Sequence, residues 1–174
     1  MLKDARDLLS PDPYYTGAAG FIGSSLESLH GDMDALELPD YVPDEVRRPH
    51  DAIRHAYIYS YFSYDLLSLA ASQTFPVLEL ALRLRLGQQF AGRVYTKNGR
   101  PNPPKLSELL EAAHKQGLIT GAFKLIAPLR NMFAHGSDTV LNPPMLLEPF
   151  KLATEMIADL FDPNKKSALP KAVS

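Results

Sequence analysis

Residues 77–87 read VLELALRLRLG, and the fold class of the chain depends on how this stretch is interpreted. Its leucines occupy every second position from Leu78 to Leu86, which is the period of a β-strand with one buried face. Leucine nevertheless favours helices, and Glu79 and Arg83 stand four positions apart, where opposite charges pair along a helix. We therefore predict a helix that is apolar on nearly all sides and lies at the centre of the fold.

Helical spacing continues on both sides of this stretch. Upstream, apolar and tyrosine side chains recur every three or four positions from Ile53 to Ala71, which predicts a long helix over about 49–74, and Pro76 then forces a kink or a restart. Downstream, the same spacing predicts helices at about 106–115, 120–135 and 146–160. The chain holds 27 Leu and 19 Ala residues but only 18 Val, Ile and Thr residues together. The predicted fold is all-α, an up-down bundle of four to five helices.

The chain divides by composition into three parts. Residues 1–48 are rich in Gly, Pro, Asp and Ser and are predicted to form an irregular acidic arm, residues 49–161 the helical bundle, and residues 162–174 a disordered C-terminal tail. Residues 1–51 hold 11 acids and four bases, a balance of −7, whereas residues 52–174 hold nine acids and 14 bases, a balance of +5. The front of the chain is therefore acidic and the body mildly basic.

Composition also excludes several classes of protein. The 174 residues include no cysteine, which excludes disulfide frameworks, cysteine zinc sites and thiol nucleophiles. A net charge of −2 argues against a protein that coats nucleic acid through bulk charge alone. No 18 apolar residues run together, and Pro11 interrupts the N-terminal segment before an apolar signal region forms. We therefore expect a cytoplasmic protein without a membrane partner.

Residues 16–26, TGAAGFIGSSL, resemble the glycine-rich phosphate loop of extended short-chain dehydrogenases, with Gly17, Gly20 and Gly23 at the required spacing. That loop needs a buried strand in front of it, and the preceding DLLSPDPYY contains two prolines. No YxxxK pair is present for hydride transfer. We therefore predict no cofactor, and interpret the segment as a glycine-rich arm with a short helix over about 24–30.

Residues 129–136, LRNMFAHG, form the second candidate site. On a helical wheel Arg130 falls at the centre of an apolar arc, which consists of Phe123, Ile126, Ala127, Phe133 and Ala134. One flank of the arc is lined by Asn131, Lys124 and His135. A guanidinium in apolar surroundings is costly unless it meets an acid, a phosphate or a second subunit.

His135 falls in the last turn of this predicted helix, where the helix dipole favours a protonated imidazole. Imidazoles take up and release protons near neutral pH, and arginine is always charged. The combination of a permanent cation and a titratable group suits phosphodiester chemistry.

The motif resembles that of the HEPN superfamily, whose members carry an arginine, a polar residue directly after it, and a histidine four to six residues further on. Arg130, Asn131 and His135 occupy those positions. The resemblance covers about residues 49–161 and implies an all-helical bundle, a homodimer that brings two motifs together and, in active members, metal-independent endoribonuclease activity in toxin–antitoxin, phage-defence or RNA-processing settings. The chain departs from the family at Leu125, where some active members place an acid, and at Pro128, which would kink the helix.

The resemblance also implies a role for each motif residue. His135 takes the proton of a ribose 2′-hydroxyl, the alkoxide attacks the adjacent phosphate, and Arg130 stabilises the charge of the phosphorane. Asn131 orients the imidazole or donates to a phosphate oxygen. The products are a 2′,3′-cyclic phosphate and a 5′-hydroxyl, and neither a metal nor a cofactor takes part.

A basic stretch without acids lies between Glu79 and Glu108. The predicted RNA contacts are Lys97, Arg100, Lys105 and Lys124 for phosphates and Tyr95 for base stacking. An ordinary solvated loop is the alternative, and Asn98 with Gly99 suits the turn of a small hairpin. We further hypothesise that the arm covers this stretch, in the same or a neighbouring subunit, and competes with RNA.

Other interpretations stay open. In one, Arg130 pairs with Glu79 or a carbonyl and His135 merely caps the helix. In another, the chain is a catalytically inactive HEPN module that binds RNA, a nucleotide or a partner protein. The candidate partners are RNA, a second copy, and an antitoxin or nucleotidyltransferase. The remaining histidines lack metal-ligand spacing and are interpreted as surface or core residues, namely His30, His50, His55 and His114.

Overall fold

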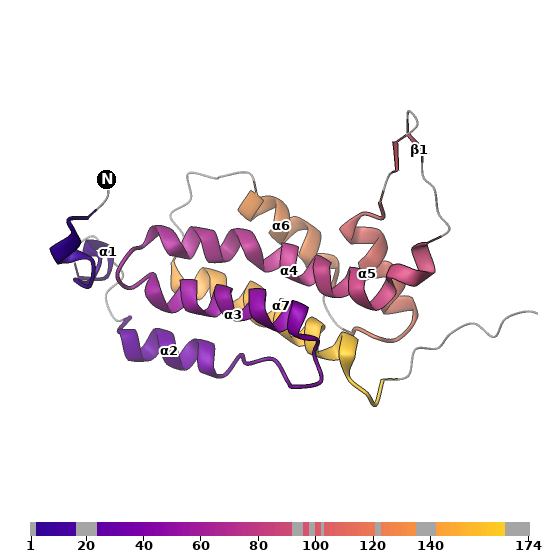
Figure 1. The fold of residues 1–174 in the computed structure, drawn as a ribbon, viewed down its shortest axis with the longest axis horizontal. Coiled ribbons are helices and arrows are strands. Elements are labelled where there is room, and N and C mark those ends of the chain that lie inside the picture. Colours follow the sequence, from indigo (N-terminus) through magenta and orange to yellow (C-terminus); the bar gives the residue numbers. More distant parts are fainter. Residues whose placement is uncertain are drawn as a thin grey trace, which may run out of the picture.

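The computed structural model describes residues 3–16, 24–91, 96–97, 100–101, 103–120, 123–134 and 142–165. These residues form an all-α helical bundle with one very short hairpin, as predicted (Figure 1). The elements are, in order, η1 (Ala5–Asp7), α1 (Pro13–Thr16), α2 (Leu26–Asp34), α3 (Asp44–Tyr59), α4 (Asp65–Phe90), β1 (Thr96–Lys97), β2 (Arg100–Pro101), α5 (Leu106–Lys115), η2 (Phe123–Leu125), α6 (Ile126–Ala134) and α7 (Pro143–Phe161). No helix within these ranges is long and apolar enough to cross a lipid bilayer.

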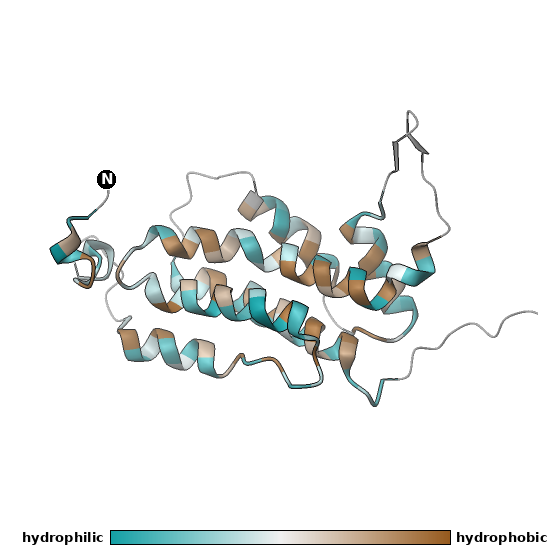
Figure 2. Cartoon of the chain, in the orientation of Figure 1, coloured by the Kyte–Doolittle hydropathy of each residue, from teal (hydrophilic) through white to brown (hydrophobic). Residues whose placement is uncertain are grey.

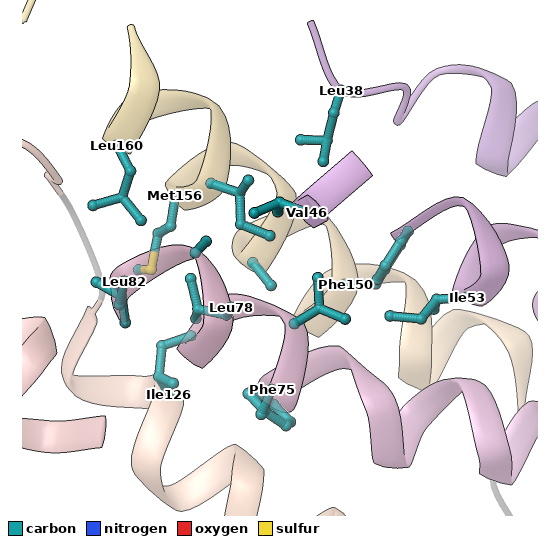
Figure 3. Close-up of a cluster of buried hydrophobic side chains, with 14 of the residues drawn as sticks. Leu38, Val46, Ile53, Phe75, Leu78, Leu82, Ile126, Phe150, Met156 and Leu160 are labelled. Atoms are coloured by element: carbon teal, nitrogen blue, oxygen red, sulfur yellow. The ribbon is translucent and has the colours of Figure 1, made fainter. Parts of the chain in front are cut away.

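Helix α4 is the centre of the bundle and contacts α3, α5, α6 and α7. The stretch VLELALRLRLG lies wholly inside it, so the prediction of a central helix is confirmed. Leu78, Leu82 and Leu86 are 0% exposed, whereas Leu80 and Leu84 face outward, because every second position of a helix cannot share one face. Hydrophilic and hydrophobic residues are interspersed along the helices (Figure 2). The core joins side chains from four helices, shown in Figure 3 as Ile53, Phe75, Leu78, Leu82, Ile126, Phe150, Met156 and Leu160.

The break between the first two long helices lies at residues 60–64, and not at Pro76 as predicted. The predicted helix over 49–74 is therefore wrong, because α3 ends at Tyr59 and α4 runs through Pro76 without a restart. Pro76 has no N–H, so the carbonyl of Ser72, four residues earlier, loses its helical hydrogen bond. Both residues lie on the exposed side of α4, where water can replace that bond.

The corner between α3 and α4 is capped by the N-terminal arm. Asp12 accepts hydrogen bonds from the backbone N–H of Tyr64 (3.1 Å) and of Tyr14 (3.0 Å), and its own N–H donates to the Tyr61 carbonyl (2.8 Å). The ring of Tyr14 stacks on that of Tyr64 with centroids 3.9 Å apart. The carboxylate that accepts from the N–H of Tyr64, just before α4, thus comes from a residue 52 positions earlier in the chain.

The arm is more regular than predicted. It contains α1 and α2, and α3 already begins at Asp44. The short helix predicted over 24–30 is confirmed as α2, with Ser25 as its N-cap. Residues 13–16 are helical and so cannot be the strand that a phosphate loop needs, while the three glycines of that motif fall within 17–23, outside the described ranges.

The arm also lies elsewhere than hypothesised. Residues 3–16 sit at the α3–α4 corner, at the opposite end of the bundle from the β1–β2 hairpin, and α2 packs along α3 (Figure 1). For the described part of the arm, the hypothesis that it covers the basic stretch of the same chain is therefore wrong.

Helices α5 and α7 follow the prediction closely, whereas the helix predicted over 120–135 begins only at Ile126, after the 3-10 turn η2. Helix α5 ends as expected, with Gly117 in the left-handed region (φ 69°) and the Leu118 N–H bonded to the Ala113 carbonyl. Helix α7 ends before Pro163. Thr96 pairs with Pro101 and Lys97 with Arg100 across the predicted hairpin.

One titratable side chain lies in the core. His50 of α3 is 1% exposed, stacks on Phe150 of α7 and bonds Thr154 through Nε2 (2.9 Å). The Thr154 hydroxyl donates its hydrogen to the Phe150 carbonyl, so the His50 Nε2 must be the donor in the bond between His50 and Thr154. Its Nδ1 is buried and has no partner among the described residues. Burial, and next the charge of Arg54, lowers the pKa of His50 from 6.5 to about 4.

We expect Asp12→Ala to lower the free energy of unfolding by about 1–2 kcal/mol, because it removes the cap of α4 and a bond that holds the arm. Asp4→Ala is the matched control, since exposed Asp4 caps only the short helix η1. Urea denaturation of both variants measures the difference. Equal effects of the two substitutions would show that the arm does not stabilise the corner.

Candidate functional site

Helix α6 carries the arginine of the motif, and its orientation differs from the prediction. Ile126 is fully buried, Leu129 and Phe133 are half-buried, and Phe133 packs on Phe75 of α4. Arg130 is exposed, so its predicted place at the centre of the apolar face is wrong. The reason is area: the helix turns its three large side chains toward α4, and the two alanines of the predicted arc gain little from burial.

Pro128 does not kink this helix. Helix α6 begins only at Ile126, after the 3-10 turn η2, so Pro128 stands in its first turn. A backbone N–H in the first turn has no partner within a helix, and proline is tolerated there. The direction of Arg130 is therefore set by a regular helix.

Arg130 and Asn131 line a cleft of about 330 Å³ between α6, α4 and the segment that enters α5. This volume is at the lower end of the range for ligand pockets, roughly 300–1,000 Å³. The other lining residues are Glu79 and Arg83 of α4, Ala127 of α6, and Pro103, Pro104, Lys105, Leu106 and Ser107. The cleft thus joins three cations, Arg83, Lys105 and Arg130, to one acid, a net charge of +2.

The Arg83 guanidinium is held firmly in the wall of this cleft. Its Nε and Nη2 both donate to Glu79 Oε1, at 3.1 and 2.6 Å, and Nη2 also donates to the Pro104 carbonyl at 3.0 Å. The predicted Glu79–Arg83 pair is therefore confirmed. Only Nη1 is left without a partner among the described residues.

Arg130 is in a different state from Arg83. Within the described ranges it forms no ion pair and no hydrogen bond, and the Glu79 carboxylate is bonded to Arg83. The alternative in which Arg130 pairs with Glu79 is therefore wrong for the described part of the chain. An exposed guanidinium in a positively charged cleft is available to an anion from outside.

The other predicted site residues have different outcomes. Lys105 lines the cleft, and its backbone N–H donates to Glu108 at the start of α5. Lys124 is exposed but is not among the described residues that line the cleft. For Lys97 and Arg100 only the backbone is described, in the hairpin. His135 and Tyr95 lie outside the described ranges.

Sequence spacing does not indicate that Arg83 and Ser107 line the cleft. Arg83 belongs to the acid-free basic stretch, but its spacing predicts only the pair with Glu79. The stretch itself divides in the fold, because Arg85 points elsewhere and donates to the Leu160 carbonyl near the end of α7 (2.9 Å). Only the packing of α5 and α6 beside α4 shows which cations share a cleft.

A larger hollow, of about 410 Å³, lies between α2 and α3 and includes His30, His55 and Arg54. We favour the smaller cleft, because the Arg54 guanidinium is already bonded to Asp51 (2.7 Å) and to the Met33 carbonyl (2.9 Å). No three His, Asp or Glu side chains in the described parts of the chain are placed to hold a metal ion.

Comparisons with known proteins give no match: no protein-family model, no curated protein and no solved structure is found to be similar to this chain. The resemblance to the HEPN superfamily therefore rests on the motif residues Arg130, Asn131 and His135 and on the helical layout around them.

Proposed function

We propose that the chain is a metal-independent endoribonuclease of the HEPN type, which acts in the cytoplasm in a toxin, defence or RNA-processing role. The observation that carries the proposal is the state of Arg130. This side chain is exposed, has no ionic partner among the described residues, and lines a cleft with two further cations. Such a cleft attracts an anion, and the phosphodiester of RNA is an anion that the motif is equipped to cleave.

In the proposed reaction the 2′-hydroxyl of the bound RNA loses its proton to His135, and its oxygen forms a bond to the adjacent phosphorus. Arg130 donates to the phosphate oxygens, where negative charge increases in the transition state. The bond from phosphorus to the 5′-oxygen then breaks, and that oxygen takes up a proton from water. A 2′,3′-cyclic phosphate and a 5′-hydroxyl result, with Asn131 in a supporting role beside Arg130.

The test is incubation of the purified chain with structured RNA in EDTA. We expect fragments that end in a 2′,3′-cyclic phosphate and begin with a 5′-hydroxyl, and no such fragments from His135→Ala prepared in parallel. Fragments of equal yield from both proteins would point to a contaminating nuclease. A folded wild type that cleaves no RNA would overturn the proposal and favour the binding module.

The proposal includes the partners that the resemblance implies. A homodimer would appear in light scattering as a particle of twice the monomer mass. An antitoxin or nucleotidyltransferase partner belongs to the same proposal, and co-expression with such a protein would be expected to suppress RNA cleavage.

A further inference from the structure

The cleft carries more positive charge than one phosphodiester can neutralise. Arg83, Lys105 and Arg130 outnumber Glu79 by two charges, whereas one phosphodiester supplies a single negative charge. Two consecutive phosphates would balance the cleft. The three cations come from three different segments that line the cleft, namely α4, the residue before α5, and α6.

The guanidinium of Arg83 is held in one orientation by its own hydrogen bonds. A guanidinium has five N–H groups, and in Arg83 three of them are used by Glu79 and Pro104. These bonds fix the plane of the group and leave the two hydrogens of Nη1 for a ligand. A donor that is already immobilised loses little conformational entropy when it binds.

Lys105 completes this side of the cleft. Its side chain is exposed, and its ammonium makes no ion pair with any carboxylate in the described ranges. Lys105 directly follows Pro104, whose carbonyl accepts from Arg83, so the backbone of Lys105 lies close to the Arg83 guanidinium, and both residues line the cleft. We infer that Arg83 and Lys105 form a second phosphate subsite, which binds the RNA phosphate next to the one held by Arg130.

This inference rests on the proposed function for the identity of the ligand, and it deepens it. It states that the substrate must have at least two consecutive phosphates, so that a dinucleotide with one phosphate is a poor ligand. It also makes Glu79 a positioning residue, since its carboxylate holds Arg83 and touches no phosphate.

The experiment compares the affinities of two 2′-O-methylated RNA oligonucleotides of random sequence. One is a dinucleotide with one phosphate, and the other is a trinucleotide with two phosphates. The methyl groups prevent cleavage, so that only affinity is measured. A trinucleotide offers two registers, which accounts for about a twofold advantage without any subsite. With the subsite, wild type is expected to bind the trinucleotide at least about tenfold more tightly at low salt, because one more charge-assisted contact is made.

The variants separate the contributions of the side chains. Arg83→Ala and Lys105→Ala are each expected to reduce this ratio to about two, whereas Lys115→Ala, an exposed cation at the other end of α5, keeps the wild-type ratio. Glu79→Gln retains an oxygen that accepts from Arg83 and is expected to keep the ratio, whereas Glu79→Ala releases Arg83 and lowers it. Both Glu79 variants lose the same charge, so their difference reports positioning alone.

The outcomes for the subsite and for the nuclease are distinct. A wild-type ratio of about two, failure to bind either oligonucleotide, or a ratio that survives in both Arg83→Ala and Lys105→Ala would overturn the subsite. Cleavage of unmodified RNA is scored separately. A tenfold ratio without cleavage would support the subsite and overturn the proposed nuclease function. Cleavage with a ratio of about two would support the nuclease function and overturn the subsite.

Discussion

Arg130→Ala is expected to lower kcat for RNA cleavage roughly a thousandfold, which is the scale seen when a donor to transition-state charge is removed. Because Arg130 is exposed and forms no bond within the described ranges, its loss removes nothing that holds the fold together. The free energy of unfolding should therefore change by no more than about 0.5 kcal/mol. Single-turnover cleavage and thermal unfolding, measured on the same preparation, test both parts.

Arg130→Lys refines this test. Lysine keeps the charge but lacks the planar pair of donors that matches a phosphate, so an intermediate rate is expected. Arg48→Ala is the matched control, since Arg48 is an exposed arginine of α3 that lines a different hollow. If Arg130→Ala cleaves RNA as fast as wild type, the reaction takes place elsewhere on the molecule. If it unfolds, Arg130 has a structural role that the described contacts do not contain.

Acid is expected to destabilise the fold through His50. The folded pKa of this group is about 4 and its ordinary value is 6.5, so the unfolded chain binds a proton that the folded chain rejects. The contribution of His50 to the free energy of unfolding is complete above about pH 6.5. It falls as the pH drops from 6.5 to about 4 and is fully lost below about pH 4. A difference of this size corresponds to about 3 kcal/mol in the free energy of unfolding.

His50→Gln isolates this contribution from the titration of carboxylates. Its amide can still donate to Thr154, but it binds no proton near these pH values. The loss of stability between pH 6.5 and 4 should be smaller in the variant than in wild type by about 3 kcal/mol, as measured by urea denaturation. His55→Gln, at an exposed position of α3, is the control and should behave as wild type. An unchanged pH dependence in His50→Gln would refute the argument.

Much of the fold could be predicted because its signals are local. The charge pair of Glu79 and Arg83 and the preference of leucine for helices identified the central helix against a misleading alternation. Gly117 ended α5 where its left-handed conformation is needed.

The α3–α4 corner could not be predicted, because what stabilises it is not local. Residues 60–64 contain no strong helix breaker, and the cap comes from Asp12 and the buried hydrogen bond from Tyr15 to Ser60 (2.6 Å). Pro76, the strongest local signal, had no such consequence because it lies on the exposed side of α4. Tertiary contacts decided the first case and exposure to solvent the second, and neither can be read from local sequence.

The candidate site was predictable in its residues but not in its surroundings. The spacing of Arg130, Asn131 and His135 singled out the helix that contains α6, yet the helical wheel gave each apolar residue the same weight and so placed Arg130 at the buried centre. The cleft depends on how α5 and α6 lie beside α4, which no spacing within one helix can reveal.

The aromatic rings at the α3–α4 corner have a practical consequence for spectroscopy. The chain contains no tryptophan, and of its eight tyrosines two lie in α1 and four between positions 57 and 64, namely Tyr14, Tyr15, Tyr57, Tyr59, Tyr61 and Tyr64. Its intrinsic fluorescence therefore comes mainly from the end of the bundle where the arm is attached. Changes in emission would report release of the arm, and a ligand in the cleft would need a label of its own to be seen.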